Sequence, residues 1–193
     1  ISEIKKLKLK IKNNCFKLKK NKLVGISSKG INENFSTEPP LSLYGSSKLM
    51  SEKLIQEYCM FNKIPFIINR CGLLAGSGQF CKSDQGIISY WINSWKGNKK
   101  LNYIDFGCKG YQVRDCLHPL DLGNLIKKQI KFLQIKKPKR SIFNVSGGII
   151  SSFSLKELSL WCEKNMFPKT ISFIKKARPF DLKWIVLDNS IVK

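Results

Sequence analysis

At 193 residues and 42% hydrophobic composition, the chain is long enough to bury a core as one domain or one and a half. No apolar run approaches the roughly 18 residues of a membrane span, and the lysine-rich start lacks the apolar centre of a secretory signal, so neither feature is predicted. The seven scattered cysteines contain no Cys-x-x-Cys pair, which argues against a zinc site or disulfide frame and predicts reduced thiols in a cytoplasmic protein.

The net charge of +22 comes from 31 Lys and only 4 Arg. Together with many Ile, Asn and Phe residues, this balance is what an AT-rich coding bias would place on solvated faces. The alternative is a nucleic-acid-binding module, in which lysines contact phosphates. Aromatic residues interleaved with arginine, or a recognition helix, would favour that alternative, and neither is visible, so no specific nucleic-acid partner is expected. A positive field also suits a small substrate that carries a diphosphate.

Residues 1–23 hold nine lysines, which in places alternate with Leu7, Leu9 and Ile11. This alternation predicts an edge strand or hairpin, although a solvated insertion without chemistry stays open as the alternative. Residues 25–40 are rich in Ser, Gly, Asn, Glu and Pro, which predicts a loop. Because the chain begins with Ile, we expect an upstream part.

A helix of about five turns is predicted over residues 41–61, with Ser42 as its cap. One apolar stripe runs along it, at spacings of four, four and three residues, through Met50, Leu54, Tyr58 and Phe61.

Tyr44 and Lys48 are four residues apart, so both side chains leave one face of this helix and can act on one small object. A phenol has a pKa near 10 and needs about 4 kcal/mol of stabilisation of its anion to take a proton near neutral pH. A lysine ammonium about 4 Å away supplies roughly that much at an effective dielectric of about 20. The spacing alone is weak evidence, because about one Tyr-x-x-x-Lys is expected by chance. An ordinary exposed Tyr and Lys on a packing helix is the alternative.

The rest of the chain alternates between strand and helix patterns, which predicts an α/β fold. A short apolar run at residues 64–69 predicts a buried parallel strand, and the glycine-rich stretch 70–79 follows at its carboxyl end, where open α/β sheets bind ligands. The remaining predicted elements are a helix at 84–96, a strand at 101–106, a short strand before Pro119, a helix at 119–132, a strand at 142–145, a helix from the Ser154 cap to Asn165, and a strand at 171–174.

Four motifs stand in order along the chain: Tyr44-Gly-Ser-Ser-Lys48, Arg70-Cys-Gly-Leu-Leu-Ala-Gly76, Gln112-Val-Arg-Asp115 with Asp121, and Arg178-Pro-Phe-Asp181. In order and spacing they resemble the extended short-chain dehydrogenase/reductase superfamily and its NAD-dependent epimerase/dehydratase family. Stretches 78–86 and 114–122 are similar to the CDP-paratose (CDP-tyvelose) 2-epimerase group of nucleotide-sugar epimerases. The resemblance covers about residues 30 to 190.

The resemblance implies the C-terminal portion of a Rossmann-type doubly wound parallel sheet plus a small mixed α/β substrate domain. Residues 1–83 would form part of the NAD-binding domain, completed by about 119–148, while residues 84–118 and 149–193 would form the substrate-binding domain. The family's Gly-x-x-Gly-x-x-Gly phosphate loop and the Ser or Thr of its catalytic triad are absent and expected upstream of Ile1. The chain alone is therefore expected to bind NAD weakly or not at all and to be inactive.

The activity that the resemblance implies is NAD-dependent epimerisation of a nucleotide-diphosphate sugar through a transient keto intermediate. Tyr44 would take a proton from a sugar hydroxyl as hydride passes to the nicotinamide, while Lys48 would hold the cofactor ribose and lower the tyrosine pKa. The backbone against the nicotinamide carboxamide would be that of Cys71, Gly72, Leu73 and Leu74. A nucleotide-sugar 4,6-dehydratase or a reductase of the same superfamily stays open, as does a homodimer in the full-length protein.

For the substrate, Arg114 and Arg178 match family arginines that grip the diphosphate, a task for a fixed fork of donors that lysine performs poorly. Asp181 matches a residue near the nucleotide ribose, and Gln85 matches the sugar side. Leu73 stands where many members carry an Asn that donates to the substrate.

Several residues of these motifs also have a structural interpretation. Arg70 at a strand end is expected to be an ion-pair partner. Asp115 and Asp121 are expected to fix a loop and a helix start. His118, the single histidine, is expected to be a hydrogen-bonded strand residue.

Overall fold

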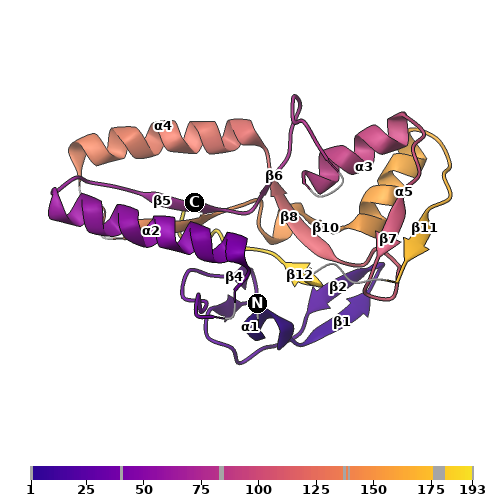
Figure 1. Cartoon of the computed structure of the whole chain (residues 1–193), viewed down its shortest axis with the longest axis horizontal. Coiled ribbons are helices and arrows are strands. Elements are labelled where there is room, and N and C mark those ends of the chain that lie inside the picture. The colour runs from indigo at the N-terminus through magenta and orange to yellow at the C-terminus, as the bar shows by residue number, and fades with distance from the viewer. Residues whose placement is uncertain are drawn as a thin grey trace.

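A computed structural model describes residues 2–39, 41–82, 85–136, 138, 140–175 and 181–192. Its helices, labelled in Figure 1, are α1 Ser2–Lys5, α2 Leu43–Phe61, α3 Ile87–Lys96, α4 Pro119–Ile135 and α5 Leu155–Asn165, with a 3₁₀ turn, η1, at Ile149–Ser151. Its strands are β1 Leu9–Lys12, β2 Cys15–Leu18, β3 Ile26–Ser27, β4 Gly30–Ile31, β5 Ile68–Cys71, β6 Leu73–Leu74, β7 Asn102–Ile104, β8 Val113–Leu117, β9 Ile142–Val145, β10 Ser152–Ser154, β11 Ser172–Ile174 and β12 Trp184–Ile185.

The parallel pair β5–β9 lies between two long helices, α2 on one face and α4 on the other (Figure 1). Two successive side chains of β5 contact the helices on opposite faces of the sheet. Arg70 bonds to Glu52 of α2, whereas Asn69 exchanges two amide hydrogen bonds of 2.8 and 2.9 Å with Gln129 of α4. A parallel sheet with helices on both faces is the doubly wound arrangement that the family resemblance implies.

Strand β8 is the centre of the second sheet. It pairs antiparallel with β10, parallel with β12, and parallel with β6, whose Leu73 lies opposite Cys116. Because β6 follows β5 after a single residue, Gly72, the chain passes directly from one sheet to the other at the carboxyl end of β5. The glycine-rich stretch after β5 therefore lies where the two sheets meet.

The lysine-rich first residues form an antiparallel hairpin, β1–β2, so the hairpin prediction is confirmed. Its apolar side chains belong to one core cluster with the centre of the second sheet, made up of Leu7, Cys15, Phe16, Ile31, Val113, Trp184 and Val186. Leu7, Cys15 and Phe16 are buried, Leu9 and Leu18 are half-buried, and Ile11 is exposed with most of the lysines. The division of the chain into a cofactor part and a substrate part at residue 83 stays a prediction.

A second core cluster joins α3, α5 and β7, and it contains Trp91, Trp95, Leu101, Tyr103, Leu155, Leu158 and Cys162. The Trp91 and Tyr103 rings stack with centroids 5.6 Å apart, and both side chains donate hydrogen bonds to the Ser159 hydroxyl oxygen, at 3.0 and 2.8 Å. Helix α5 begins with a capping box, in which the Ser154 hydroxyl accepts from the Glu157 N–H and the Glu157 carboxylate accepts from the Ser154 N–H.

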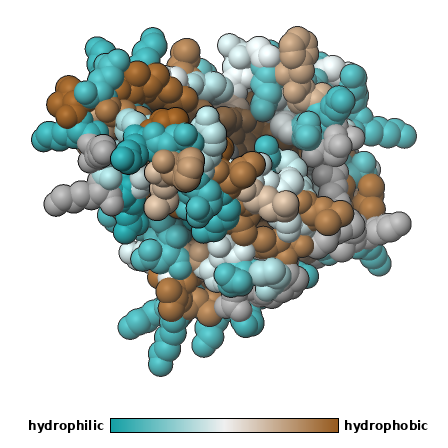
Figure 2. Space-filling model, turned by 60° about the vertical axis from the view of Figure 1, so that its left-hand side comes forward, coloured by the Kyte–Doolittle hydropathy of each residue, from teal (hydrophilic) through white to brown (hydrophobic). Residues whose placement is uncertain are grey.

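The buried face of helix α2 is not the one that the sequence predicts. It begins at the predicted Ser42 cap, whose hydroxyl accepts from the Gly45 N–H at 3.0 Å, and it ends at Phe61. Its apolar stripe is exposed, and the side chain that it buries against β5 is that of Glu52. Figure 2, which turns the α2 and α4 side forward, shows brown apolar side chains among teal hydrophilic ones on this side.

Two other predictions need adjustment. The buried strand expected at residues 64–69 is β5, which starts later and is half-exposed. His118 lies just beyond β8 and not within it, and its Nδ1 caps α4 by accepting from the Leu120 N–H at 3.2 Å. Every helix among the described residues is too short or too polar to cross a bilayer.

Candidate active site

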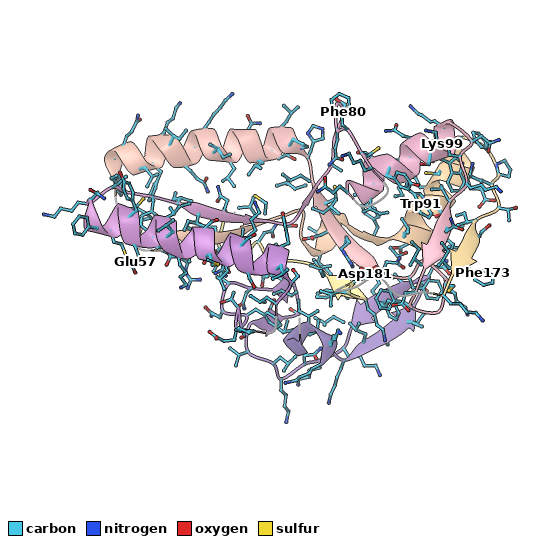
Figure 3. All side chains as sticks on the ribbon, viewed as in Figure 1. Glu57, Phe80, Trp91, Lys99, Phe173 and Asp181 are labelled. Atoms are coloured by element: carbon cyan, nitrogen blue, oxygen red, sulfur yellow. The ribbon has the colours of Figure 1, made fainter. Side chains whose placement is uncertain are left out.

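A cavity of about 320 Å³ lies between α3, α5 and the strands β7, β8 and β10. Its apolar walls include Ile88 and Trp91 of α3, Phe153 of β10 and Leu158 of α5. The polar residues on its lining are Gln85, Tyr90, Asn102, Gln112, Arg114 and Asp181. Figure 3 labels Trp91 and Asp181, which approach this region from α3 and from the segment before β12. A small hollow with apolar walls and a few polar groups is typical of a ligand site.

Arg114 is the charged group that the fold builds into this wall. It comes from β8, and two of its guanidinium nitrogens donate hydrogen bonds, Nη2 to Asp181 Oδ1 at 2.9 Å and Nη1 to the Val113 carbonyl at 2.8 Å. Both side chains of the Arg114–Asp181 pair are 23% exposed. Burial lowers the pKa of Arg114 below its ordinary value, while the neighbouring carboxylate of Asp181 opposes that shift. The ion pair thus holds a guanidinium in a fixed direction at the cavity wall.

Gln112 is two residues before Arg114 and lines the same cavity. Its Oε1 is buried and has no hydrogen-bond partner among the described residues. A buried acceptor without a partner costs about 1–3 kcal/mol, and a ligand N–H or O–H would remove that cost. Gln112 is therefore a candidate contact that the sequence interpretation did not assign, although it opens one of the quoted motifs.

Tyr44 and Lys48 lie together on the first two turns of α2. The Lys48 Nζ is 5.5 Å from the centre of the Tyr44 ring, and the tyrosine is 72% exposed. The residues between them are small, so nothing on the helix itself covers this face. The two side chains thus share one helix face, as their spacing predicts, with the ammonium over the tyrosine ring, and their catalytic roles stay a prediction.

Gly72 joins β5 to β6 at a position that has no room for a side chain. Its N–H donates to the Val145 carbonyl of β9 at 2.8 Å, and a Cβ at this position would collide with the Ser146 hydroxyl. The backbone from Cys71 to Leu74 therefore passes close to the end of β9. This is the stretch predicted to lie against the nicotinamide.

Asp115 is the buried anchor of the same region, with 1% of its surface exposed. Its Oδ2 accepts from the Ser146 hydroxyl, from the Gly148 N–H at 3.1 Å and from the Leu187 N–H at 3.0 Å. One carboxylate oxygen thus ties β8 to the ends of β9 and β12. The expectation that Asp115 fixes a loop agrees with these contacts, and Asp121 lies in the first turn of α4.

The predicted site residues thus form two groups. Gln85, Arg114 and Asp181 line the cavity, while Tyr44 and Lys48 lie on α2 and are not among its lining residues. Arg178 lies outside the described residues. Among the described residues, no group of three or more His, Cys, Asp or Glu side chains is placed to hold a metal ion.

A sequence model described as the NAD dependent epimerase/dehydratase family matches residues 11–146, well over half of the chain. The chain belongs to this family. The CDP-paratose 2-epimerase of Salmonella typhi, a curated relative, is 29% identical over 121 residues, which are 61% of this chain and 35% of that protein.

Solved structures of epimerases and dehydratases share the fold. The UDP-glucuronic acid 4-epimerase of Bacillus cereus, in complex with UDP-glucuronic acid and NAD, superposes with a TM-score of 0.68 at 22% identity, over 88% of this chain and 51% of that one. The NAD complex of dTDP-glucose 4,6-dehydratase from Bacillus anthracis gives 0.65 at 19% identity, over 88% of this chain and 50% of that one. The chain therefore spans about half the length of these family structures, and what it carries is part of a Rossmann-like epimerase/dehydratase fold.

Proposed function

We propose that this chain carries the substrate-binding residues and the catalytic Tyr-Lys pair of an NAD-dependent epimerase that acts on a nucleotide-diphosphate sugar. The observation that carries the proposal is Arg114, a guanidinium fixed by Asp181 in the wall of a cavity that is otherwise mostly apolar. The apolar walls suit the faces of a nucleoside, and the guanidinium suits a phosphate group beside it.

Arg114 keeps donors free for such a ligand. A guanidinium has five N–H groups, and the structure assigns one to Asp181 and one to the Val113 carbonyl. The remaining N–H groups form a planar fork that matches two phosphate oxygens. Asp181 has two roles in this proposal. It fixes the guanidinium of Arg114, and it lines the cavity in which the ligand would lie.

Tyr44 is proposed as the base that takes the proton from a sugar hydroxyl, and Lys48 as the cation that stabilises the resulting phenolate. The exposed face around the pair, and the close-packed backbone at Gly72, fit the nicotinamide end of NAD. NAD, when bound, supplies the acceptor and donor of a hydride. Tyr44 holds the proton during that exchange and returns it to the sugar oxygen at the end, with inversion at the carbon.

A 4,6-dehydratase or a reductase would use the same Tyr-Lys pair, and one of the structural relatives is a dehydratase. The match to a CDP-paratose 2-epimerase favours epimerisation. A dehydratase would release a keto-deoxy sugar nucleotide and a reductase would consume reduced cofactor, so product analysis separates the three reactions.

The proposal retains the cytoplasmic location predicted from the scattered cysteines.

The substrate half of the proposal can be tested on the chain itself by calorimetric titration with CDP, UDP and dTDP. At least one nucleoside diphosphate should bind with a Kd in the micromolar to millimolar range, and the matching nucleoside and inorganic phosphate should each bind more weakly. Arg114→Lys should weaken diphosphate binding about tenfold, because lysine replaces a two-bond fork with a point charge. Arg140→Lys changes an exposed arginine and is the matched control. Equal affinity in the wild type and both variants would exclude the diphosphate role.

A further inference from the structure

The positive charge of the chain is concentrated in one segment. Nine of the 18 residues in the range 5–22 are lysine, and none is acidic. The other 175 residues hold the remaining 22 lysines and all 13 acidic residues. A coding bias would raise the lysine content along the whole chain, so it does not explain this difference in density. The segment consists of the hairpin β1–β2 and the residues on both sides of it, at the lower edge of Figure 1.

Strand β2 joins the hairpin to the body of the protein. The Phe16 N–H donates to the Tyr111 carbonyl at 3.0 Å. The Ser154 hydroxyl, at the start of α5, donates to the Asn14 carbonyl at 2.8 Å. Strand β1 is the outer strand, and no described strand pairs with its other edge. The lysines are thus carried on a frame that is already ordered, which lowers the entropy cost of binding a partner.

Lysines lie opposite one another across this hairpin. Lys10 is the register partner of Lys17, and two residues further along the Lys19 N–H donates to the Lys8 carbonyl at 2.9 Å. Side chains two residues apart on a strand share a face, so the two lysine pairs lie side by side. Like charges directly opposite each other destabilise a sheet. An anionic surface placed over this face would remove that repulsion.

The hairpin has little counter-charge within the protein. Lys8, Lys10 and Lys19 have no ion-pair partner among the described residues. Glu157 lies beside the turn end of the hairpin, but it is engaged in the capping box of α5. Asp181 lines a cavity with Lys10, but it is engaged in its ion pair with the arginine of β8. The positive charge of the hairpin is therefore available to an external partner.

We propose that the lysine face of the hairpin β1–β2 is a docking surface for a membrane that contains anionic lipids. Clusters of about four to eight basic residues are typical of segments that bind such membranes, because each lysine near the surface adds to the affinity. Binding of this kind is peripheral and does not require a helix that crosses the bilayer. The surface is separate from the nucleotide site of the proposed function, and each can be tested without the other.

Exposed aliphatic side chains favour a lipid surface over a nucleic acid. Ile11, between two lysines of β1, is 60% exposed, and Val24, two residues after Lys22, is 78% exposed. Such side chains can enter the boundary between the lipid headgroups and the acyl chains. Residues 5–22 contain no arginine, and their one aromatic residue, Phe16, is buried. The segment therefore offers no exposed ring on which a base could stack.

Protection of a sheet edge is the structural alternative, since lysines on an edge strand discourage pairing with another chain. That role requires charge on the outer strand β1. Lys17, Lys19 and Lys20 lie on or directly after β2, which is the inner strand. Edge protection therefore does not account for the lysines on both sides of the hairpin.

The first test is sedimentation of the chain with phosphatidylcholine vesicles, with and without phosphatidylglycerol as the anionic lipid. At low salt the chain should bind the anionic vesicles at least about tenfold more tightly than the neutral ones, because several lysines act together. High salt should reduce this difference, since it screens the charges. Equal binding to both kinds of vesicle, or binding to neither, would overturn the proposal.

Two variants that lose the same charge separate the hairpin from the net charge of +22. Each replaces four exposed lysines with Gln, at Lys8, Lys10, Lys12 and Lys19 in the hairpin variant and at Lys127, Lys128, Lys131 and Lys136 of α4 and its C-cap in the control. The hairpin variant should bind anionic vesicles at least about tenfold more weakly, and the control less than about threefold more weakly. Loss of opposed like charges favours the hairpin, so the fold should be retained, as circular dichroism can verify. Equal losses in the two variants would overturn the proposal.

A third variant separates a lipid partner from a nucleic acid. Ile11→Ser combined with Val24→Ser keeps every lysine and should weaken binding to anionic vesicles at least about threefold, because it removes the side chains that enter the lipid. Binding of a DNA duplex should be the same as in the wild type. Unchanged vesicle binding by this variant would overturn the proposal. Duplex binding that requires the hairpin lysines, together with vesicle binding that does not, would assign the surface to nucleic acid and would also overturn it.

Discussion

Arg70 and Glu52 form a two-bond ion pair that joins β5 to the buried face of α2, with nitrogen–oxygen distances of 2.8 and 2.6 Å. The hydrogen bonds to Arg70 hold the pKa of Glu52 below its ordinary value of 4.5, and those to Glu52 raise the pKa of Arg70. This pair is a direct link between α2 and the sheet. It therefore positions the helix that carries Tyr44 and Lys48.

Glu52→Gln should lower the free energy of unfolding by about 1–2 kcal/mol at pH 7, because it leaves a half-buried guanidinium without its counter-charge. Since the folded pKa of Glu52 is depressed, its contribution is present above about pH 4.5 and lost as the pH falls further. The difference between wild type and variant should thus shrink in acid. Urea unfolding at a series of pH values measures it.

The matched control is Glu57→Gln, on the exposed side of the same helix and labelled in Figure 3. It should change stability by less than about 0.5 kcal/mol. An equal loss in both variants, or a difference that stays constant down to pH 3, would contradict a specific role for the ion pair.

Asp115→Ala should be among the most destabilising single changes in the chain. It deprives the Ser146 hydroxyl and the N–H groups of Gly148 and Leu187 of their shared acceptor. At about 1–3 kcal/mol for each unsatisfied buried group, a loss of about 3 kcal/mol or more is expected. Asp121→Ala, in the first turn of α4, should cost only about 0.3–1 kcal/mol. Thermal melts compare the two, and similar melting temperatures would show that Asp115 is not an anchor.

Local signals explain which elements could be predicted from the sequence. Helix α5 starts and ends where its Ser154 cap and apolar pattern place it, and β9 covers the predicted residues 142–145, because both depend on adjacent residues. The start of α2 at Ser42 follows for the same reason. The cap role of His118 has no such local signal, because histidine is not among the usual helix caps.

Contacts between distant segments explain what could not be predicted. Periodicity shows which residues of α2 share a face, but burial of Glu52 depends on Arg70, which a strand brings from 18 residues away. Likewise Arg114 and Asp181 are 67 residues apart in the sequence. Only the family resemblance places both at the substrate site, and no local pattern predicts their ion pair. Asn102 lines the cavity from β7 with no local pattern to mark it.

Gly123→Ala should stabilise the chain by about 0.5–1 kcal/mol, because an alanine in a helix interior loses less backbone entropy than glycine. Gly123 lies within α4, and a side-chain carbon at this position would extend into open space. Gly72→Ala should have the opposite sign, since its Cβ would collide with the Ser146 hydroxyl. Urea unfolding of the two variants measures both, and stabilisation by Gly72→Ala would show that the backbone there is not close-packed.

Tyr44→Phe tests the chemistry, in an active enzyme that contains this chain. Removal of the phenol oxygen should reduce turnover by at least about 10²-fold, because no acceptor remains for the sugar hydroxyl proton. Binding of the nucleoside diphosphate should be unchanged, since Arg114 and Asp181 are not altered. Tyr58→Phe, an exposed tyrosine on the same helix, is the matched control and should retain full turnover. Equal turnover in both variants would rule out Tyr44 as the base, and loss of activity in both would point to a general role of the α2 surface.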